Sequence, residues 1–329
     1  MRSIIIAAAL AAGALSLCSC GKSGRTASAA EPAAEDTVST VYFIKDITPE
    51  SLVKIYDALG VTDSASNVAV KISTGESMKS HQLDPSLIAP LVRKVNGTLV
   101  ECNTAYAGNR RHTADHLKAA ADHGYTAIAK VDIMDADGDT AIAIQGGKHL
   151  PYDIVGKHLM DYDRMLVLSH FKGHQMGGFG GALKNISIGV ASSDGKTWIH
   201  SGGKTRNTDE VWSNIAEQDV FLESMADAAK GVIDHMKGNM LYINVANNLS
   251  IDCDCNGNPA APDMKDIGIL ASTDPVALDR ACVDLIYNST DPGKDGLIHR
   301  MEEMHGPHIL DAAEALGIGR QAYKIVAIE

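Results

Sequence analysis

Several common signatures of cofactor binding are missing from this chain of 329 residues. No segment has the Gly-x4-Gly-Lys-Ser/Thr spacing of a phosphate-binding P-loop, and none has the Gly-x-Gly-x-x-Gly fingerprint of a dinucleotide-binding turn. No C-x2-C-x2-C run is present, which is the usual cysteine spacing of ferredoxin-type iron–sulfur sites. Internal repeats are also absent, so the functional site has to be found from clusters of unusual residues.

Positive charge is scarce as well. The chain has 29 Lys and Arg residues against 41 Asp and Glu residues, which gives a formal net charge of −12. Proteins that bind nucleic acids through phosphate contacts need a basic surface. The sequence therefore predicts that nucleic acid is not a partner.

The N-terminus has the pattern of an export signal. Arg2 precedes an apolar run over residues 4–17, which is too short to span a bilayer as a helix. The run ends in Leu-Cys-Ser-Cys, which resembles the lipobox of bacterial lipoproteins, with Cys20 as the lipidated residue. No twin-arginine pair is present, which argues against export of a prefolded, cofactor-loaded protein. An ordinary secretory signal with incidental cysteines is the alternative.

These features predict the domain organisation and the location. We expect a signal peptide over residues 1–19, a flexible tether over residues 20–40 and one domain over residues 41–329. The tether is small and polar, so it cannot bury a core. The sequence therefore predicts a protein of the cell envelope, in the periplasm or on the outer surface, that touches the membrane only through its lipid anchor.

Strand patterns alternate with helix patterns along the domain. Asp84 and Pro85 begin a helix that runs to about Val95, and Thr113 caps a second helix that Gly124 ends. Asp274 and Pro275 begin a third. The strands predicted from apolar runs are Val68–Ile72, Thr98–Cys102, Ala127–Ile133, Thr140–Gln145, Met165–Leu168, Tyr242–Ala246 and Ile267–Leu270. This order predicts a single large α/β domain with a mainly parallel sheet covered by helices, in which sites lie at the carboxyl ends of strands.

The first cluster of polar residues follows the strand that ends at Cys102. Arg110 and Arg111 could hold a carboxylate or phosphate in bidentate fashion. Asn103 and Tyr106 are further candidates for ligand binding in the same loop. The alternative is a solvated loop whose arginines pair with surface acids.

The second cluster follows the apolar strand Met165–Leu168. We expect His170, His174 and Lys184 to be catalytic, with both histidines as metal ligands or acid–base groups. The glycines between His174 and Lys184 would let the backbone approach a ligand closely, and Asn185 is a further residue predicted to bind that ligand. The glycines predicted to bind ligand are Gly177, Gly178, Gly180 and Gly181. The alternative is that the glycines serve only a tight crossover of the chain.

The third cluster is Asp-Cys-Asp-Cys at residues 252–255. Export favours disulfides, but two cysteines this close would form a strained small ring. That leaves metal binding, free thiols, or pairing with Cys102 or Cys282, although Cys282 has the pattern of a core residue. The predicted metal ligands are His170, His174, Cys253 and Cys255.

Three long segments carry a family resemblance. ECNTAYAGNRRHTADHLKAAADHGY, SHFKGHQMGGFGGALKNISIG and INVANNLSIDCDCNGNPAAPDMKDIGILASTDPVALDRACVDL resemble the bacterial domain of unknown function 362, over about Val68 to Tyr287. Its members are often labelled as iron–sulfur centre proteins, and many carry a ferredoxin-like four-cysteine module. The corresponding stretch here, Lys204 to Lys237, contains no cysteine and has a helix pattern. The sequence therefore argues against an iron–sulfur cluster and allows a divalent metal ion as cofactor.

The stretch from His174 to Lys184 also resembles, over a short length and with different spacing, the nickel-dependent lactate racemase family. In that family histidines and a lysine serve a nickel–pincer cofactor. The leading hypothesis is a metal-dependent enzyme or redox protein that acts on a small anionic molecule. The alternatives are a lipid-anchored protein that binds such an anion without catalysis, or an envelope scaffold.

Overall fold

The computed structural model describes residues 38–61 and 65–329. The predicted signal peptide, Cys20 and nearly all of the predicted tether lie outside these residues. The first strand, β1 (Ser39–Ile44), begins just inside the segment predicted as tether. No helix of the described residues has the length and hydropathy needed to cross a membrane.

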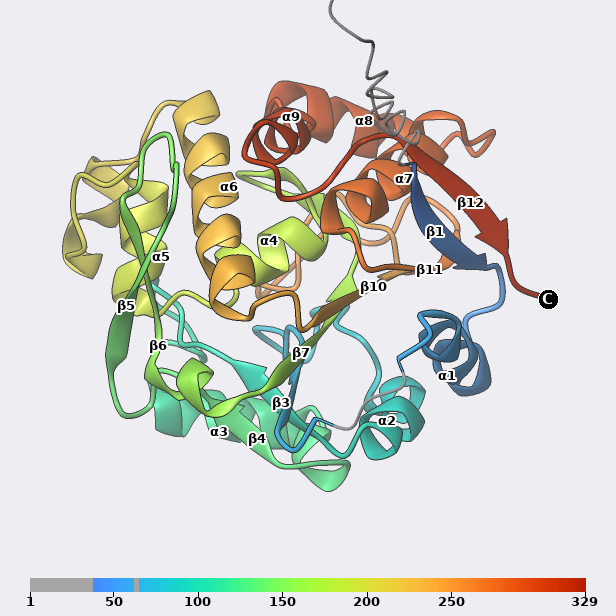
Figure 1. The fold of residues 1–329 in the computed structure, drawn as a ribbon, viewed down its shortest axis with the longest axis horizontal. Coiled ribbons are helices and arrows are strands. Elements are labelled where there is room, and N and C mark those ends of the chain that lie inside the picture. The colour runs from blue at the N-terminus through green and yellow to red at the C-terminus, as the bar shows by residue number, and fades with distance from the viewer. Residues whose placement is uncertain (1–37, 62–64) are drawn as a thin grey trace, which may run out of the picture. The chain divides into compact units, whose positions relative to one another are not determined.

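A central eight-stranded sheet organises the domain (Figure 1). Five neighbouring pairs are parallel, whereas β11 lies antiparallel to both β1 and β10. The predicted α/β class with a mainly parallel sheet is therefore confirmed. In spatial order the strands are β12 (Tyr323–Ala327), β1, β11 (Gly268–Ser272), β10 (Met240–Ala246), β7 (Arg164–His170), β2 (Val68–Lys71), β3 (Gly97–Glu101) and β4 (Val131–Ile133).

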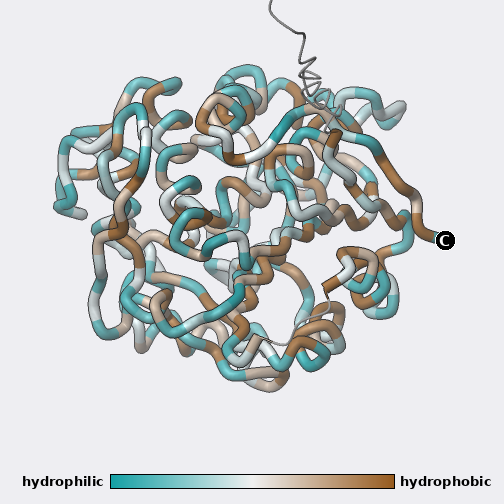
Figure 2. The backbone as a smooth tube through the Cα atoms, in the orientation of Figure 1, coloured by the Kyte–Doolittle hydropathy of each residue, from teal (hydrophilic) through white to brown (hydrophobic). Residues whose placement is uncertain are grey.

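Helices bury both faces of this sheet. Side chains alternate along β7, so Met165 and Val167 join one apolar core while Leu166 and Leu168 join the other. This explains why the central strands are continuous apolar runs, which Figure 2 shows as hydrophobic segments inside a more polar outline. One face is covered by α1 (Pro49–Ala58), α2 (Pro85–Lys94) and α3 (Thr113–Asp122). The other is covered by α4 (Ala182–Ser187), α5 (Ser193–His200), α6 (Gln218–His235), α7 (Pro275–Tyr287), α8 (Lys294–Glu303) and α9 (His308–Ala315).

Two of the three predicted helix starts have the expected caps. The Asp84 carboxylate accepts from the Ser86 N–H, and the Asp274 carboxylate accepts from the first N–H groups of α7. The third prediction is wrong in detail, because the residue before α3 is His112, which makes no side-chain cap. Thr113 lies inside the helix, and its hydroxyl accepts from Asn103 instead.

Two strand predictions need correction. Only Val131–Ile133 of the predicted strand 127–133 pairs in the sheet, because residues 125–127 form a 3-10 turn. The segment predicted at residues 140–145 forms β5 (Asp139–Ala143), which pairs with β6 (Tyr152–Gly156) in a separate hairpin.

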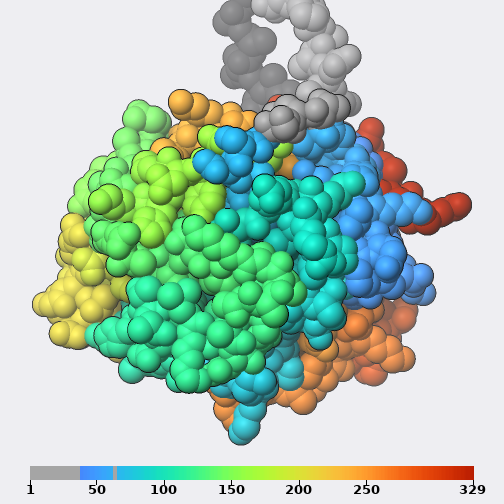
Figure 3. All heavy atoms as spheres, turned by 90° about the horizontal axis from the view of Figure 1, so that it is seen from below, coloured from blue at the N-terminus to red at the C-terminus, as the bar shows by residue number. Residues whose placement is uncertain are grey.

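Figure 3 shows that the first half of the described chain, in blue to green, forms most of the face seen there.

Candidate functional site

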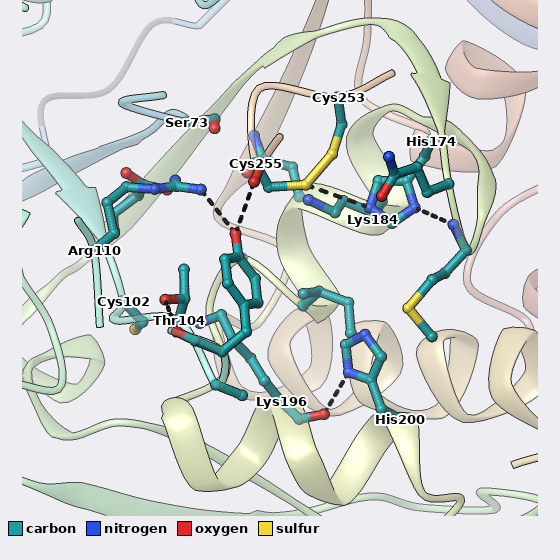
Figure 4. Close-up of a pocket in the computed structure, with 18 of the residues that line it drawn as sticks. Ser73, Cys102, Thr104, Arg110, His174, Lys184, Lys196, His200, Cys253 and Cys255 are labelled. Atoms are coloured by element: carbon teal, nitrogen blue, oxygen red, sulfur yellow. Dashed lines mark hydrogen bonds and ion pairs between the residues drawn. A yellow bond between two sulfur atoms is a disulfide. The ribbon is translucent and has the colours of Figure 1, made fainter. Parts of the chain in front are cut away.

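A cavity of about 210 Å³ lies at the carboxyl edge of the parallel strands. Its walls come from the ends of β2 and β3, from the loops after β3 and β10, and from α4 and α5. This is the edge at which open α/β sheets place their ligands. The basic side chains on its wall are Lys71, Arg110, His174, Lys184, Lys196 and His200. Figure 4 labels all of these except Lys71.

Lys184 reaches this cavity from the first turn of α4. The Asp279 carboxylate holds that turn, because it accepts from the N–H groups of Ala182 and Leu183. Gly181 makes the contact feasible, since a Cβ there would lie 2.3 Å from Asp279 Oδ1. Lys184 Nζ has no hydrogen-bond or ion-pair partner among the described residues. Burial, followed by the charges of neighbouring cations, lowers the Lys184 pKa to about 7.

Two further lysines point their ammonium groups at neutral atoms. Lys71 Nζ donates to the Ile72 carbonyl and to Asn185 Oδ1, at 2.5 and 3.0 Å. Lys196 Nζ donates to the Ala191 carbonyl at 2.6 Å. Burial lowers the Lys71 pKa to about 8. None of the three lysines has a carboxylate within ion-pair distance among residues 38–61 and 65–329, so their charge faces the cavity without a direct counter-ion.

The arginines do not form the predicted clamp. Arg110 lines the cavity, but its guanidinium donates to Glu76 and Glu101 at 3.0 and 2.9 Å, and all three groups are buried. Its charge is therefore balanced by two internal carboxylates. Arg111 is not on the cavity wall and lies 3.6 Å from exposed Asp209.

The other predicted ligand-binding residues divide between the cavity and the scaffold. Tyr106 and Asn185 line the cavity, whereas Asn103 bonds Thr113 and is not on the wall. None of the four predicted glycines is on the wall either. Gly178 has a φ of +76°, and a Cβ there would lie 2.7 Å from Gly306 Cα, so its place in the chain is explained by packing.

His174 ends the short strand β8 (Lys172–His174) and has a defined tautomer. Its Nδ1 accepts from the N–H groups of Gly177 and Met176, at 2.9 and 3.3 Å. Burial, followed by the charge of Lys184, lowers the His174 pKa well below its usual range, so the ring is neutral. The ring proton is therefore on Nε2, which lies 4.0 Å from Cys255 Sγ.

His200 has the opposite tautomer. Its Nδ1 lies 2.6 Å from the Lys196 carbonyl and must donate to it, and burial lowers the His200 pKa to about 4. The unprotonated Nε2 has no partner among the described residues. The cavity thus has the N–H of His174 near the cysteine sulfur atoms and the lone pair of His200 on α5. His200 is in the lower part of Figure 4.

His170 does not join His174 and His200 at the cavity, because its ring is bonded elsewhere. Its Nδ1 bonds Asp254 at 2.9 Å, and its Nε2 bonds the Asn247 carbonyl at 2.6 Å. Asp254 also accepts from Lys172 Nζ at 2.8 Å. Both ring nitrogens are occupied and His170 is not on the cavity wall, so the structure does not place it beside His174 as a shared ligand.

The two neighbouring cysteines are joined, which corrects the sequence-based argument against this pairing. Cys253 and Cys255 form a disulfide, whereas Cys102 and Cys282 are free and buried. A turn explains the pairing, because the Asn256 N–H donates to the Cys253 carbonyl at 2.9 Å. The intervening Asp254 side chain is engaged with His170 and Lys172, and both sulfur-bearing residues line the cavity.

His174, Cys253 and Cys255 form the one group of the described residues whose ligand atoms lie close enough for a shared metal ion, within 4.8 Å of one another. In this state they do not fit one. Metals bind thiolates, and a disulfide has none. A histidine that ligates through Nε2 donates its Nδ1 proton to an acceptor, whereas His174 Nδ1 faces two N–H donors.

Sequence patterns could have found some of the missed cavity residues. Lys71 is a lysine inside an otherwise apolar, buried strand, which is costly without a role. Lys196, His200 and Trp212 have no such signal, because they reach the cavity through the packing of α5 and the following segment. Trp212 is 64% exposed at the cavity wall.

Comparisons with known proteins identify a family and the general fold. A family model described as "Domain of unknown function (DUF362)" matches residues 68–284. The lactate racemase apoprotein from Thermoanaerobacterium thermosaccharolyticum has 15% identity and a TM-score of 0.43, over 75% of this chain and 57% of that one. A protein from Thermotoga maritima has 12% identity and a TM-score of 0.39, over 81% and 58%. This chain thus spans under two thirds of either structure, and no curated protein matches it.

Proposed function

The chain belongs to the DUF362 family, and from this premise we propose that it binds a small anionic compound in the cavity and acts on it. The family description names no activity, so the proposal rests on the site. The observation that carries it is Lys184, which lines the cavity and whose ammonium group has no partner within residues 38–61 and 65–329. Lys184 is half-buried, and a cation in such a place without a counter-ion is costly to keep charged, so a ligand with negative charge would stabilise it.

The surroundings of Lys184 support an anion in particular. The protein carries a net charge of −12, yet Lys71, Lys184 and Lys196 bring three ammonium groups to one cavity. Glu101 is also on the wall, but it is paired with Arg110, and no carboxylate of the described residues lies within ion-pair distance of the three lysines. Around them, His174 offers an N–H and His200 a lone pair. A bound anion could therefore accept hydrogen bonds from lysine and histidine and exchange a proton with His200.

The test is calorimetric titration of the oxidised protein with sulfate, oxalate and acetate. We expect at least one of them to bind, and Lys184→Met to weaken that binding roughly 10–100-fold, the usual value of a hydrogen bond to a charged group. Trp212 fluorescence provides a second readout at the cavity wall. Lys157→Met is the matched control, because Lys157 is exposed. Equal affinity in the two variants would contradict the proposal.

Metal-dependent chemistry is a second candidate, favoured by the group of His174, Cys253 and Cys255. It requires reduction of the disulfide and a turn of the His174 ring that gives up its bonds to Gly177 and Met176. Elemental analysis after incubation of the reduced protein with Zn²⁺ tests it. One tightly held zinc ion per chain, lost in His174→Ala, would support this candidate, and no retained metal would contradict it.

Attachment to the cell envelope is also part of the proposal. It is supported by the apolar run and the Leu-Cys-Ser-Cys pattern before residue 21, which resemble a lipoprotein signal. A lipid anchor on Cys20 would leave the acidic domain in the aqueous phase beside the membrane. The cavity would then meet small molecules of the envelope.

A further inference from the structure

We propose that Cys253 and Cys255 are a redox-active pair, with Cys255 as the attacking thiol, and that their substrate is a small anionic disulfide held in the cavity. The charge of this substrate rests on the proposed function. The thiol–disulfide chemistry itself stands on independent observations. These are the position of the disulfide, the support of the turn that carries it, and the tautomer of His174.

Cys253 and Cys255 differ from the other described cysteines in their position, because they line the cavity. Cys253 and Cys255 both line the cavity, and their sulfur atoms are bonded to each other. Cys102 and Cys282 are 2% and 1% exposed, and burial raises the pKa of each thiol well above its usual range. Structural cysteines of that buried kind are inert, whereas a disulfide on a cavity wall is open to thiol exchange.

The turn that carries the pair is held from both sides. The Glu76 N–H donates to the Asp254 carbonyl at 2.8 Å, and the Asp254 carboxylate is bonded to His170 and Lys172. Tyr106 Oη donates to the Cys255 carbonyl at 3.3 Å. These contacts do not involve the sulfur atoms, so the turn can keep its place when the disulfide is reduced.

His174 is suited to stabilise a thiolate at Cys255. Its Nε2 carries the ring proton, because Nδ1 is fixed as an acceptor by Gly177 and Met176. In the reduced protein that N–H can donate to the Cys255 sulfur, and the nearby Lys184 adds positive charge. His174 cannot be the base that removes the thiol proton, because the nitrogen facing the sulfur is already protonated; the thiol proton therefore goes to solvent.

The exchange reaction balances without a further cofactor. The Cys255 thiolate attacks one sulfur of the substrate disulfide, forms a mixed disulfide and releases the first product thiolate. The Cys253 thiol loses a proton to solvent and attacks Cys255 Sγ, which releases the second product thiolate and restores the Cys253–Cys255 bond. Two electrons pass from the protein dithiol to the substrate. A small-molecule dithiol regenerates the reduced protein and becomes a disulfide itself.

Cys255 is the better candidate for the attacking residue. It is more exposed than Cys253, which is 3% exposed, and it is the cysteine whose sulfur lies beside His174 Nε2. The order of attack can be tested because each single serine variant leaves one thiol of the pair. Cys253→Ser should form a lasting mixed disulfide with a substrate, since the second attack is blocked.

The first experiment measures the pH profile of Cys255 alkylation by iodoacetamide in the Cys253→Ser variant. We expect a midpoint at least one pH unit below the value of about 8.5 for a free cysteine. Adding His174→Ala should move the midpoint back upward, whereas adding His299→Ala, at an exposed histidine, should not. A midpoint at or above that of a free cysteine, or one unchanged by His174→Ala, would overturn the redox assignment.

The second experiment uses the reduced full chain with Cys18→Ser and Cys20→Ser, so that only the cavity pair reacts, and two probes, the dianionic 5,5′-dithiobis(2-nitrobenzoate) and the neutral 4,4′-dithiodipyridine. We expect two equivalents of thiolate per chain, a reformed Cys253–Cys255 bond, and a several-fold preference for the anionic probe that Lys184→Met removes. If the unchanged protein and Lys184→Met had the same preference between the two probes, the proposal of an anionic substrate would be overturned. Because anion binding is measured separately on the oxidised protein, failure of the redox pair and failure of the proposed function give different results.

Discussion

At the scale of single residues, the site depends on which charges have partners. Arg110 and Lys184 are both cations on the cavity wall, but Arg110 pairs with Glu76 and Glu101, whereas Lys184 has no counter-ion in the part of the chain that the structure describes. The same burial that lowers the Lys184 pKa to about 7 makes it the group most responsive to a bound anion. A paired arginine keeps the scaffold in place, whereas an unpaired lysine is available for a ligand.

This unpaired lysine should affect stability in a pH-dependent way. The folded-state pKa of Lys184, about 7, is below its unfolded value of 10.5, so the unfolded chain binds more protons between these values. The free energy of unfolding should therefore increase as the pH rises through this window. Lys184→Met should lose that part of the increase and should melt roughly 2–6 °C higher near pH 7 without ligand. Thermal unfolding monitored by circular dichroism measures both effects.

The control for this prediction is again Lys157→Met, which should melt like the unchanged protein at every pH. Part of the increase should persist in Lys184→Met, since burial also lowers the pKa of Lys71, to about 8. If Lys184→Met melted lower than the unchanged protein near pH 7, Lys184 would have a stabilising partner, which disagrees with the structure.

At the scale of elements, local patterns predicted the scaffold better than the site. The apolar runs of β7 and β10 and the Asp-Pro starts of α2 and α7 are local signals, and the structure has each of them. The antiparallel β11 and the separate β5–β6 hairpin are not local, because strand direction and partner choice depend on the whole chain.

The site shows the same difference between local and distant information. His174, Lys184, Cys253 and Cys255 were recognised as unusual from their own segments, and the structure places all four on one cavity wall. Their roles remain predictions. The pairing of Arg110 with Glu76, the diversion of His170 to Asp254, and the contribution of Lys196 depend on contacts between distant segments, which one sequence does not reveal.

At the scale of the whole molecule, an acidic domain encloses a basic cavity. The net charge of −12 would repel anions at long range, so selectivity has to come from short-range contacts inside the cavity. A lipid anchor would keep such a domain at the membrane, since no helix in residues 38–61 and 65–329 is long and apolar enough to span it. That arrangement predicts how the full-length protein behaves in the cell.

The anchor is tested by fractionation of cells that express the full chain. We expect the protein in the membrane fraction, and Cys20→Ala in the soluble fraction or as an unprocessed precursor, because the lipid would have no attachment point. Cys18→Ala is the matched control and should remain with the membrane. Unchanged membrane attachment of Cys20→Ala would contradict the proposed anchor.

The central claim is that Lys184 binds a small anion through its positive charge. Its most direct test is calorimetry of the oxidised protein with sulfate and oxalate, whose charges are constant between about pH 6 and pH 9. Because the free Lys184 ammonium loses its proton near pH 7, affinity should fall as the pH rises above that value, and Lys184→Met should bind weakly at both ends of the range. Anion affinity that is the same in the unchanged protein and in Lys184→Met across this range would contradict the account.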